Sequence, residues 1–206
     1  MTGKQILYLV DDDEAIRHSA SFMLRHEGFV VKTYEHGVAF LEQLDSKARG
    51  CVLLDLRMPH MDGLAVQQKL TENGFDLPVI ILTGHGDVPI AVQAMKAGAV
   101  DFVQKPYEKQ TLLKAIESAF EQMDEDVSHS GRAREAKARL AALTAREREV
   151  LERLVQGLTN KAIAEDLGIS PRTIEIHRAN LMTKLEADSL SSALRIAFFA
   201  GLGVEA

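Results

Sequence analysis

The stretch Ile6-Leu7-Tyr8-Leu9-Val10-Asp11-Asp12 contains the pattern that decides the fold, an apolar run of strand length that ends in carboxylates. A second run, Cys51-Val52-Leu53-Leu54, ends in the same way at Asp55. Neither run alternates apolar with polar residues, so we expect both faces of each strand to be buried. Burial on both faces is typical of parallel sheets that are covered by helices.

Amphipathic helical segments alternate with strands of this kind over the first 122 residues. This alternation predicts an α/β fold of the flavodoxin-like, doubly wound type, with a five-stranded parallel sheet in the order 2-1-3-4-5 and right-handed crossovers. Strands are expected at 6–10, 29–34, 51–54, 78–82 and 100–103, and helices at 14–27, 37–44, 63–71, 88–96 and 108–123.

Composition and charge divide the chain and limit its function. The sequence predicts a first domain at 1–123, a linker at 124–139 whose second half is helical, and a small all-α domain of four helices at 140–206. Residues 140–206 carry eight basic and nine acidic side chains, so any DNA binding must come from a local patch that dimerisation doubles.

Other features of the sequence predict the compartment. The single cysteine excludes a disulfide scaffold, no apolar run is long enough for a bilayer span, and the first residues lead into a strand instead of a signal peptide. We therefore expect a cytoplasmic protein without a membrane segment.

Polar residues follow four of the five expected strands. Asp11, Asp12 and Asp55 end neighbouring strands, and three close carboxylates repel one another unless a cation joins them. Oxygen ligands of this kind suit Mg²⁺, which supports chemistry on phosphate. Thr83 offers a hydroxyl and Lys105 an ammonium to a phosphoryl group, and a cis peptide is expected before Pro106. The alternative is that the aspartates only cap strand ends.

A helix-turn-helix is expected in the second domain. Helices at 159–167 and 170–185 meet at Gly168-Ile169, a short turn of the kind such motifs use. In the second helix we expect Glu175 to accept a bond from cytosine and Ile176 or Ala179 to contact a thymine methyl group. The alternative is a plain four-helix bundle with a solvated face. The residues expected to face inward are Ile174, His177, Leu181 and Leu185, and the candidate phosphate contacts are Lys161, Arg172, Arg178 and Lys184.

The first domain resembles response-regulator receiver domains of the CheY-like fold. The resemblance rests on the motifs Val10-Asp11-Asp12, Asp55-Leu56-Arg57-Met58-Pro59, Asp62-Gly63, Thr83-Gly84 and Lys105-Pro106. It implies that Asp55 accepts a phosphoryl group from a histidine kinase and that the Arg57 carbonyl joins the three aspartates as a Mg²⁺ ligand. It also implies that Thr83 and Lys105 bind the phosphoryl group, that Thr83 and Phe102 form a switch, and that Arg57 and His85 flank the site.

The second domain resembles the LuxR-type DNA-binding domain, and the whole chain resembles the FixJ-type (NarL/FixJ) class. The motifs are 143–151, 157–164 and Ser170-Pro171-Arg172-Thr173-Ile174-Glu175-Ile176-His177-Arg178-Ala179-Asn180. The last helix, with Leu194, Ala197 and Phe198, is then expected to pack or dimerise. The resemblance implies DNA contacts from Asn160, Lys161, Arg172, Thr173, Glu175, Ile176, Arg178, Ala179, Asn180 and Lys184.

These resemblances together imply a two-component transcription factor. They imply that a sensor histidine kinase phosphorylates Asp55, that the protein then pairs into a homodimer, and that the dimer binds double-stranded DNA, with RNA polymerase as a further expected partner. The chain is then a phosphoacceptor with at most slow autodephosphorylation and not an enzyme. The alternatives are a phosphate-independent DNA-binding regulator and a phosphatase, whose second acid would stand where Arg57 is. The expected dimer surface consists of Val88, Ile90, Ala91, Met95 and Ala99.

Overall fold

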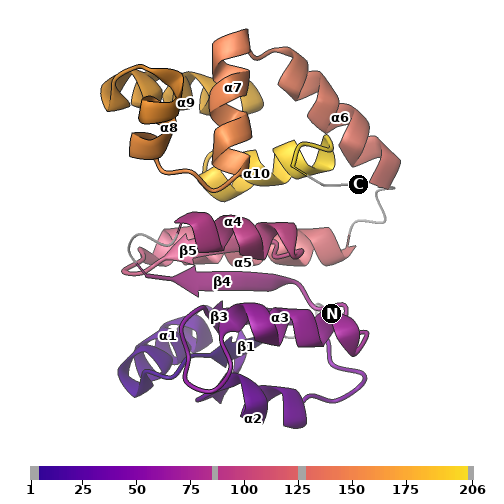
Figure 1. Ribbon diagram of the computed structural model, residues 1–206. Helices are drawn as coiled ribbons and strands as arrows, with labels where there is room; N and C mark the ends of the chain where they lie inside the picture. Colours follow the sequence, from indigo (N-terminus) through magenta and orange to yellow (C-terminus); the bar gives the residue numbers. More distant parts are fainter. Residues whose placement is uncertain (1–4, 85–87, 125–128, 204–206) are drawn as a thin grey trace. The chain divides into compact units, whose positions relative to one another are not determined.

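A computed structural model describes residues 5–84, 88–124 and 129–203 of the chain (Figure 1). The sheet has five parallel strands in the order β2-β1-β3-β4-β5, which confirms the predicted doubly wound topology. Each strand begins and ends within one residue of its expected position. The strands are β1 (Ile6–Val10), β2 (Val30–Tyr34), β3 (Cys51–Asp55), β4 (Val79–Thr83) and β5 (Asp101–Gln104).

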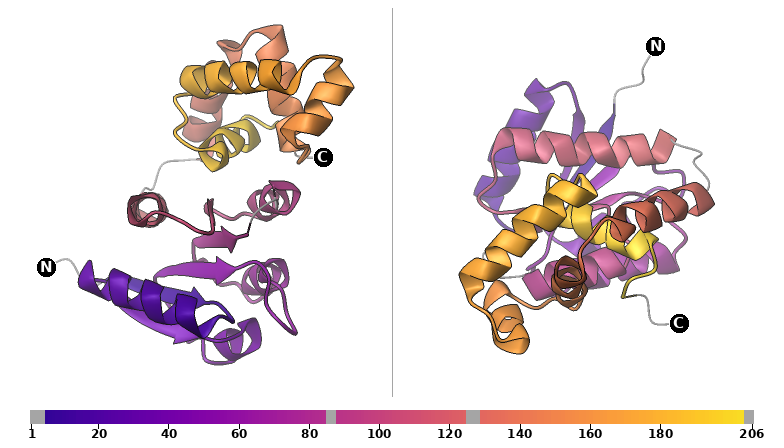
Figure 2. Two further views of the ribbon diagram at one scale, coloured as in Figure 1. Left: turned by 90° about the vertical axis from the view of Figure 1, so that its left-hand side faces the viewer. Right: turned by 90° about the horizontal axis from the view of Figure 1, so that it is seen from above.

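Helices cover both faces of this sheet, as the unbroken apolar strands require. The helices that alternate with the strands are α1 (Glu14–His26), α2 (Gly37–Glu42), α3 (Gly63–Glu72), α4 (Val88–Lys96) and α5 (Lys109–Asp124). The first view in Figure 2 shows α1 on one side of the strands and α2 with α3 on the other.

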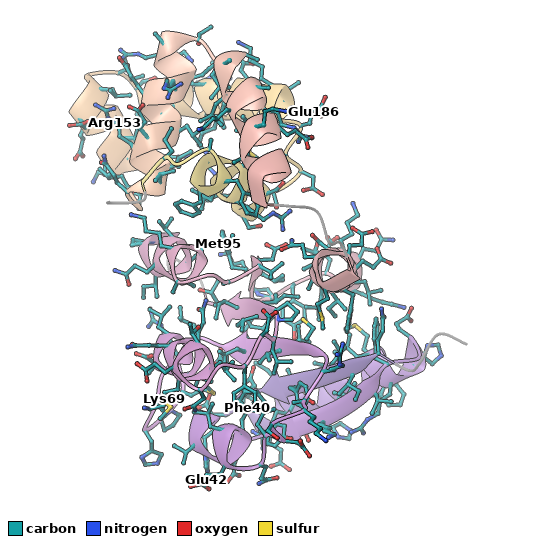
Figure 3. All side chains as sticks on the ribbon, turned by 90° about the vertical axis from the view of Figure 1, so that its right-hand side faces the viewer. Phe40, Glu42, Lys69, Met95, Arg153 and Glu186 are labelled. Carbon is teal, nitrogen blue, oxygen red and sulfur yellow. The ribbon has the colours of Figure 1, made fainter. Side chains whose placement is uncertain are left out.

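Alternate side chains of each strand supply the two cores. Leu7 and Leu9 face one core, where Leu24 of α1 and Ile116 of α5 are also fully buried. Tyr8 points to the opposite face, and its ring lies 5.7 Å from that of Phe40, which α2 contributes (Figure 3). Because successive side chains of a strand point to opposite faces of the sheet, neighbouring apolar residues enter different cores. This packing fixes the strands and therefore the positions of the residues that follow their carboxyl ends.

Short side-chain caps define where the first helices begin. Asp13 is the N-cap of α1 and accepts hydrogen bonds from the backbone N–H groups of Ala15 and Ile16. Asp62 caps α3 through the N–H of Ala65 at 2.8 Å. Both caps lie in the loops that follow β1 and β3, which carry the candidate site.

The C-terminal helices are α6 (His129–Ala141), α7 (Ala145–Val155), α8 (Asn160–Leu167), α9 (Pro171–Leu185) and α10 (Leu190–Phe199). A capping box between Thr144 and Glu147 begins α7. Gly168 takes the left-handed conformation (φ 65°) between α8 and α9, as a tight interhelical turn requires.

Contacts between Cα atoms divide the described chain into two compact units. One holds the sheet with α1, α2, α3 and α5, and the other holds α6 to α10 together with α4. The boundary predicted at 139/140 falls inside α6, because Ala136 and Leu140, one helical turn apart, are both buried and carry the helix on to Ala141. Within the described ranges, no helix is both long and apolar enough to cross a membrane.

Candidate functional site: a carboxylate cluster and a helix-turn-helix

The carboxyl ends of β1 and β3 bring the acidic residues together. Val10 pairs with Leu54 in the parallel register, so the next residue of each strand, Asp11 and Asp55, lies at the same edge of the sheet. Asp11 is fully buried, Asp55 is 7% exposed, and Asp12 is exposed. One carboxylate oxygen of each residue lies within 4.8 Å of the other two. The predicted convergence of Asp11, Asp12 and Asp55 is therefore present in the structure.

Lys105 supplies a cation between two of these carboxylates. Its Nζ donates to Oδ2 of Asp11 at 2.6 Å and to Oδ1 of Asp55 at 2.8 Å. Its backbone N–H donates to the carbonyl of Thr83 at 2.7 Å, and the bond to Pro106 is cis, as expected. Burial acts to lower the pKa of Lys105, but the hydrogen bonds to Asp11 and Asp55 outweigh it and raise the pKa, so the side chain stays charged.

The charges at this edge are not balanced. Burial raises the pKa of Asp55; Lys105 opposes this effect, and the neighbouring Asp11 and Asp12 add to it. One lysine thus neutralises part of the charge of three carboxylates. Oxygen-only donors, two of them buried, are the ligand set that suits Mg²⁺, so the residues present fit this ion.

The raised pKa of Asp55 predicts how stability depends on pH in metal-free buffer. The folded state holds the Asp55 proton more tightly than the unfolded state, so this residue's contribution to stability is present at acidic pH and is lost as the pH rises through the folded pKa. Asp55→Asn cannot titrate. We expect its unfolding free energy, measured in EDTA with urea, to exceed that of wild type by an amount that grows from acidic to neutral pH. A constant difference would contradict this.

The other residues expected at this site lie in or directly after β3, β4 and β5. Thr83 ends β4 and is 3% exposed, with its hydroxyl 3.4 Å from the carbonyl of Gly84. Phe102 is half-buried in β5, and Arg57 is exposed two residues after Asp55. The switch role of Thr83 and Phe102 and the Arg57 carbonyl as a ligand stay predictions, and His85 lies outside the described residues.

Two neighbours of the cluster were not predicted. Arg17 donates from Nη1 to the backbone carbonyl of Asp11 at 2.7 Å. Burial raises the pKa of Tyr107, Lys105 acts to lower it, and Asp11 and Asp55 add to the rise. Tyr107 comes two residues after Lys105 in the sequence, and this position could have indicated that it lies near the site.

Gly63 permits a close approach between α3 and the end of β3. A Cβ at this position would lie 2.5 Å from the carbonyl oxygen of Asp55. We expect Gly63→Ala to displace Asp55, to cost about 1–3 kcal/mol of stability, and to slow phosphorylation by acetyl phosphate several-fold. Gly28→Ala is the control, because its cost comes from a positive φ (95°) with nothing within 4 Å. Equal phosphorylation rates in the two folded variants would contradict the prediction.

Helix α9 presents an exposed face in the second unit. Ile174, Leu181 and Leu185 are buried as predicted, whereas His177 is only half-buried. Ile176 is 54% exposed, which is unusual for a large apolar side chain in the described chain. The exposed face of α9 carries Arg172, Glu175, Ile176, Ala179, Asn180 and Thr183.

Internal contacts hold several of the polar residues predicted to contact DNA. Arg178 donates from Nη1 to Oδ1 of Asn160 at 2.6 Å, and its burial lowers the pKa of the guanidinium while Glu175 acts to raise it. Thr173 bonds to Ser170 at the start of α9. Lys184 donates to Glu147 at 2.6 Å. Lys161 is exposed on α8, as Arg172 is on α9.

The residues expected to pair two copies are largely covered in this conformation. Ala91 is 0% exposed and Met95 and Ala99 are each 5% exposed, whereas Ile90 is half-buried. The side chain of Val88 lies outside the described residues. In α10, Leu194 and Ala197 are buried and Phe198 is half-buried. The use of Val88, Ile90, Ala91, Met95 and Ala99 as a dimer surface stays a prediction.

Comparison with known proteins matches both halves of the chain. Residues 7–117 match the response regulator receiver domain, and residues 141–197 match the bacterial regulatory proteins of the luxR family. The transcriptional regulatory protein FixJ of Bradyrhizobium diazoefficiens is 46% identical over 202 residues, which cover 98% of each chain. The tetrathionate response regulatory protein TtrR of Salmonella typhimurium is 42% identical over 92% of this chain and 90% of its own.

Solved structures give the same match. The full-length FixJ structure from B. japonicum superposes with a TM-score of 0.59 at 46% identity, covering 97% of this chain and 98% of that one. The response regulator StyR gives a TM-score of 0.57 at 38% identity, over 95% and 99% of the two chains. The chain belongs to the response-regulator family, as a FixJ-like transcription regulator in which a receiver domain is followed by a LuxR-type DNA-binding domain.

Proposed function

We propose that a sensor histidine kinase phosphorylates Asp55 and that the phosphorylated chain pairs into a homodimer which binds operator DNA in the cytoplasm. The observation that carries this proposal is the position of the Asp55 carboxylate, 2.8 Å from the Nζ of Lys105 and beside the buried Asp11. A carboxylate held next to a fixed cation is placed to receive a phosphoryl group, whose oxygens need positive charge around them.

The transfer is a substitution at phosphorus. An Oδ atom of Asp55 forms the new O–P bond while the bond from phosphorus to the imidazole nitrogen of the kinase breaks, and the electron pair leaves with the imidazole, which takes up a proton. Lys105 then has a phosphoryl oxygen to bind in place of the Asp55 carboxylate, and the Thr83 hydroxyl supplies a second donor. Mg²⁺, held by Asp11, Asp12, Asp55 and the Arg57 carbonyl, would neutralise charge on the non-bridging oxygens.

Phosphorylation-dependent pairing is tested by sedimentation. We expect the full chain at micromolar concentration to gain mass towards a dimer with acetyl phosphate and Mg²⁺, and Asp55→Asn to remain unchanged under the same conditions. If wild type and Asp55→Asn respond equally, the receiver is a phosphate-independent module. A slow return of the wild-type chain to its starting mass after the donor is removed would match the phosphoacceptor with slow autodephosphorylation that we propose.

Helix α9 is the element that we propose to enter the major groove. Its exposed face carries Glu175, Ile176 and Ala179, which match the donors and methyl groups that base edges present there. Asn160 and Arg178 bond to each other between α8 and α9, so this pair would approach the DNA as one unit. Two copies of α9 in a dimer would read half-sites one helical turn apart.

Arg172 tests whether this face meets DNA. It is exposed in the first turn of α9, where a phosphate contact adds affinity without sequence preference. We expect Arg172→Ala to weaken binding to specific and to random duplexes alike, and to reduce the slope of log K against log salt by about 1 per protomer. Arg148→Ala on α7, whose guanidinium pairs with Glu152, is the control. An unchanged slope for Arg172→Ala would exclude the phosphate contact.

A further inference from the structure

The C-terminal end of α9 has a feature that the proposed DNA reading does not explain. The helix ends at Leu185, and Glu186 follows with φ 54° and ψ 37°, in the left-handed conformation. Glycine usually takes this position, because another residue there costs about 1–2 kcal/mol. Contacts around Glu186 must therefore support this conformation.

Arg139 of α6 provides that support. Its Nη1 donates to the backbone carbonyl of Leu185 at 3.1 Å, and its Nη2 lies 3.5 Å from a carboxylate oxygen of Glu186, which is labelled in Figure 3. Glu135, one turn earlier in α6, fixes the same guanidinium with a bond of 2.7 Å. A cation that caps the last carbonyls of a helix also interacts favourably with the helix dipole. Arg139 is thus the C-terminal cap of α9, although it comes from another helix.

Glu147 of α7 binds Lys184, the residue that precedes Leu185 in α9. Lys184 donates from Nζ to Oε2 of Glu147 at 2.6 Å, and the same oxygen accepts the backbone N–H of Thr144 at 2.8 Å. The side chain of Glu147 is 5% exposed, and the bond to Lys184 lowers its pKa to about 2. Three consecutive positions, 184 to 186, are therefore each fixed by side chains from α6 or from the start of α7.

These contacts set the direction of the helix that carries the reading face. Ile176 lies nine residues before Leu185, which is about 13 Å along the helix axis. A tilt of about 10° at the fixed end would then move Ile176 by about 2 Å, more than a recognition contact tolerates. In the middle of α9, Arg178 bonds to Asn160 of α8 at 2.6 Å, and Ser170 caps the first turn of the helix. The contacts at the C-terminal end therefore act together with this bond in orienting α9.

We propose that Arg139 and Lys184 are positioning residues for DNA recognition, and that the DNA-binding unit includes α6 from at least Glu135 onwards. The proposal rests on the proposed role of α9 in the major groove. It assigns to Lys184 a function that differs from the phosphate contact expected from the sequence: the lysine acts through Glu147 and does not touch the DNA. The proposal also gives Glu135 and Arg139, which lie in the segment predicted to be a linker, a part in DNA recognition.

The two roles of Lys184 predict opposite results for Glu147→Gln. This change removes the charge that holds the lysine. A phosphate-contacting Lys184 would then be freed for DNA, so binding would tighten or stay the same. A positioning Lys184 would lose its anchor, so binding would weaken as in Lys184→Met.

The experiment uses the full-length chain with acetyl phosphate and Mg²⁺, and a 24-base-pair duplex that the wild-type chain has selected from a random pool. We expect Arg139→Met, Lys184→Met and Glu147→Gln each to raise the Kd about 5- to 10-fold with an unchanged salt slope, at a temperature where circular dichroism shows them folded. Arg148→Met, which breaks an exposed pair with Glu152, should leave the Kd unchanged.

A rescue separates positioning from a loss of charge. Glu186→Gly in the Arg139→Met background should recover part of the lost affinity, because glycine adopts the left-handed conformation without support. Glu186→Gln removes the same charge without this freedom and should not recover it. If a variant fails to fold, Arg139→Lys, which keeps the charge and a donor, takes its place with a smaller expected loss.

Other outcomes would overturn the inference. A salt slope reduced by about 1 for Lys184→Met, tighter binding by Glu147→Gln, or equal rescue by Glu186→Gly and Glu186→Gln would each contradict it. If the wild-type chain selects no duplex, the proposed DNA reading fails and this inference fails with it. If wild type selects a duplex and all three positioning variants bind it normally, only the inference fails.

Discussion

Asp55→Asn is expected to lose the whole response to a phosphodonor while the fold is kept. Asparagine has nearly the same shape as aspartate, but its amide cannot form the acyl phosphate. Moving a two-state equilibrium from about 1:99 to 99:1 requires about 5.5 kcal/mol, and this substitution removes whatever part of that free energy the phosphoryl group supplies. The measurements are the dimer fraction and the DNA affinity, each taken with and without acetyl phosphate and Mg²⁺.

A matched control removes one carboxylate outside the cluster. Asp76 is exposed in the segment before β4, so Asp76→Asn changes the net charge by the same amount. It should keep the full donor-dependent gain in dimer fraction and affinity. A donor-dependent gain that survives in Asp55→Asn would show that activation does not proceed through this carboxylate.

Lys105→Met is expected to produce the largest loss of stability at the site. The substitution leaves Asp11 and Asp55, both buried, without the ammonium that lies 2.6 Å and 2.8 Å from their oxygens. Removing one partner from a buried ion pair costs about 3 kcal/mol or more. We therefore expect an unfolding free energy about 3 kcal/mol below wild type in EDTA, measured by urea titration of the receiver transition.

Magnesium should restore part of this loss. A ligand that binds only the folded state at 100 times its Kd stabilises by about 2.7 kcal/mol, and without Lys105 the carboxylates have no competing cation. Lys109→Met is the control, because Lys109 makes an exposed pair with Glu27 that is worth less than about 1 kcal/mol. Equal losses in the two variants, or no greater effect of Mg²⁺ on Lys105→Met, would contradict the electrostatic account of the site.

The sheet and its acidic edge could be predicted because each depends on local sequence. Continuous apolar runs indicate strands that are buried on both faces, and residues that directly follow parallel strands must meet at one edge. Asp11, Asp55, Thr83 and Lys105 were therefore found from their positions alone. The contact of Arg17 with the Asp11 carbonyl was missed, because any long donor on α1 can reach a backbone carbonyl and the sequence does not indicate which one does.

Partners distant in the sequence account for what was missed in the second unit. The helical period correctly separates Ile174 and Leu181 from the exposed Glu175 and Ile176. It does not reveal that Lys184 bonds to a residue 37 positions earlier. The four basic residues of α8 and α9 were therefore all taken as candidates for phosphate, although Lys184 bonds to Glu147 of α7 and Arg178 bonds to Asn160 of α8.

The most direct test of the whole account is the mass of the intact chain after incubation with acetyl phosphate and Mg²⁺. We expect a gain of about 80 Da, the mass of one phosphoryl group, which peptide mapping after borohydride reduction assigns to Asp55 and which is absent without Mg²⁺ and in Asp55→Asn. No gain in mass, or a gain that maps to another residue, would contradict the central claim that this carboxylate receives the phosphoryl group.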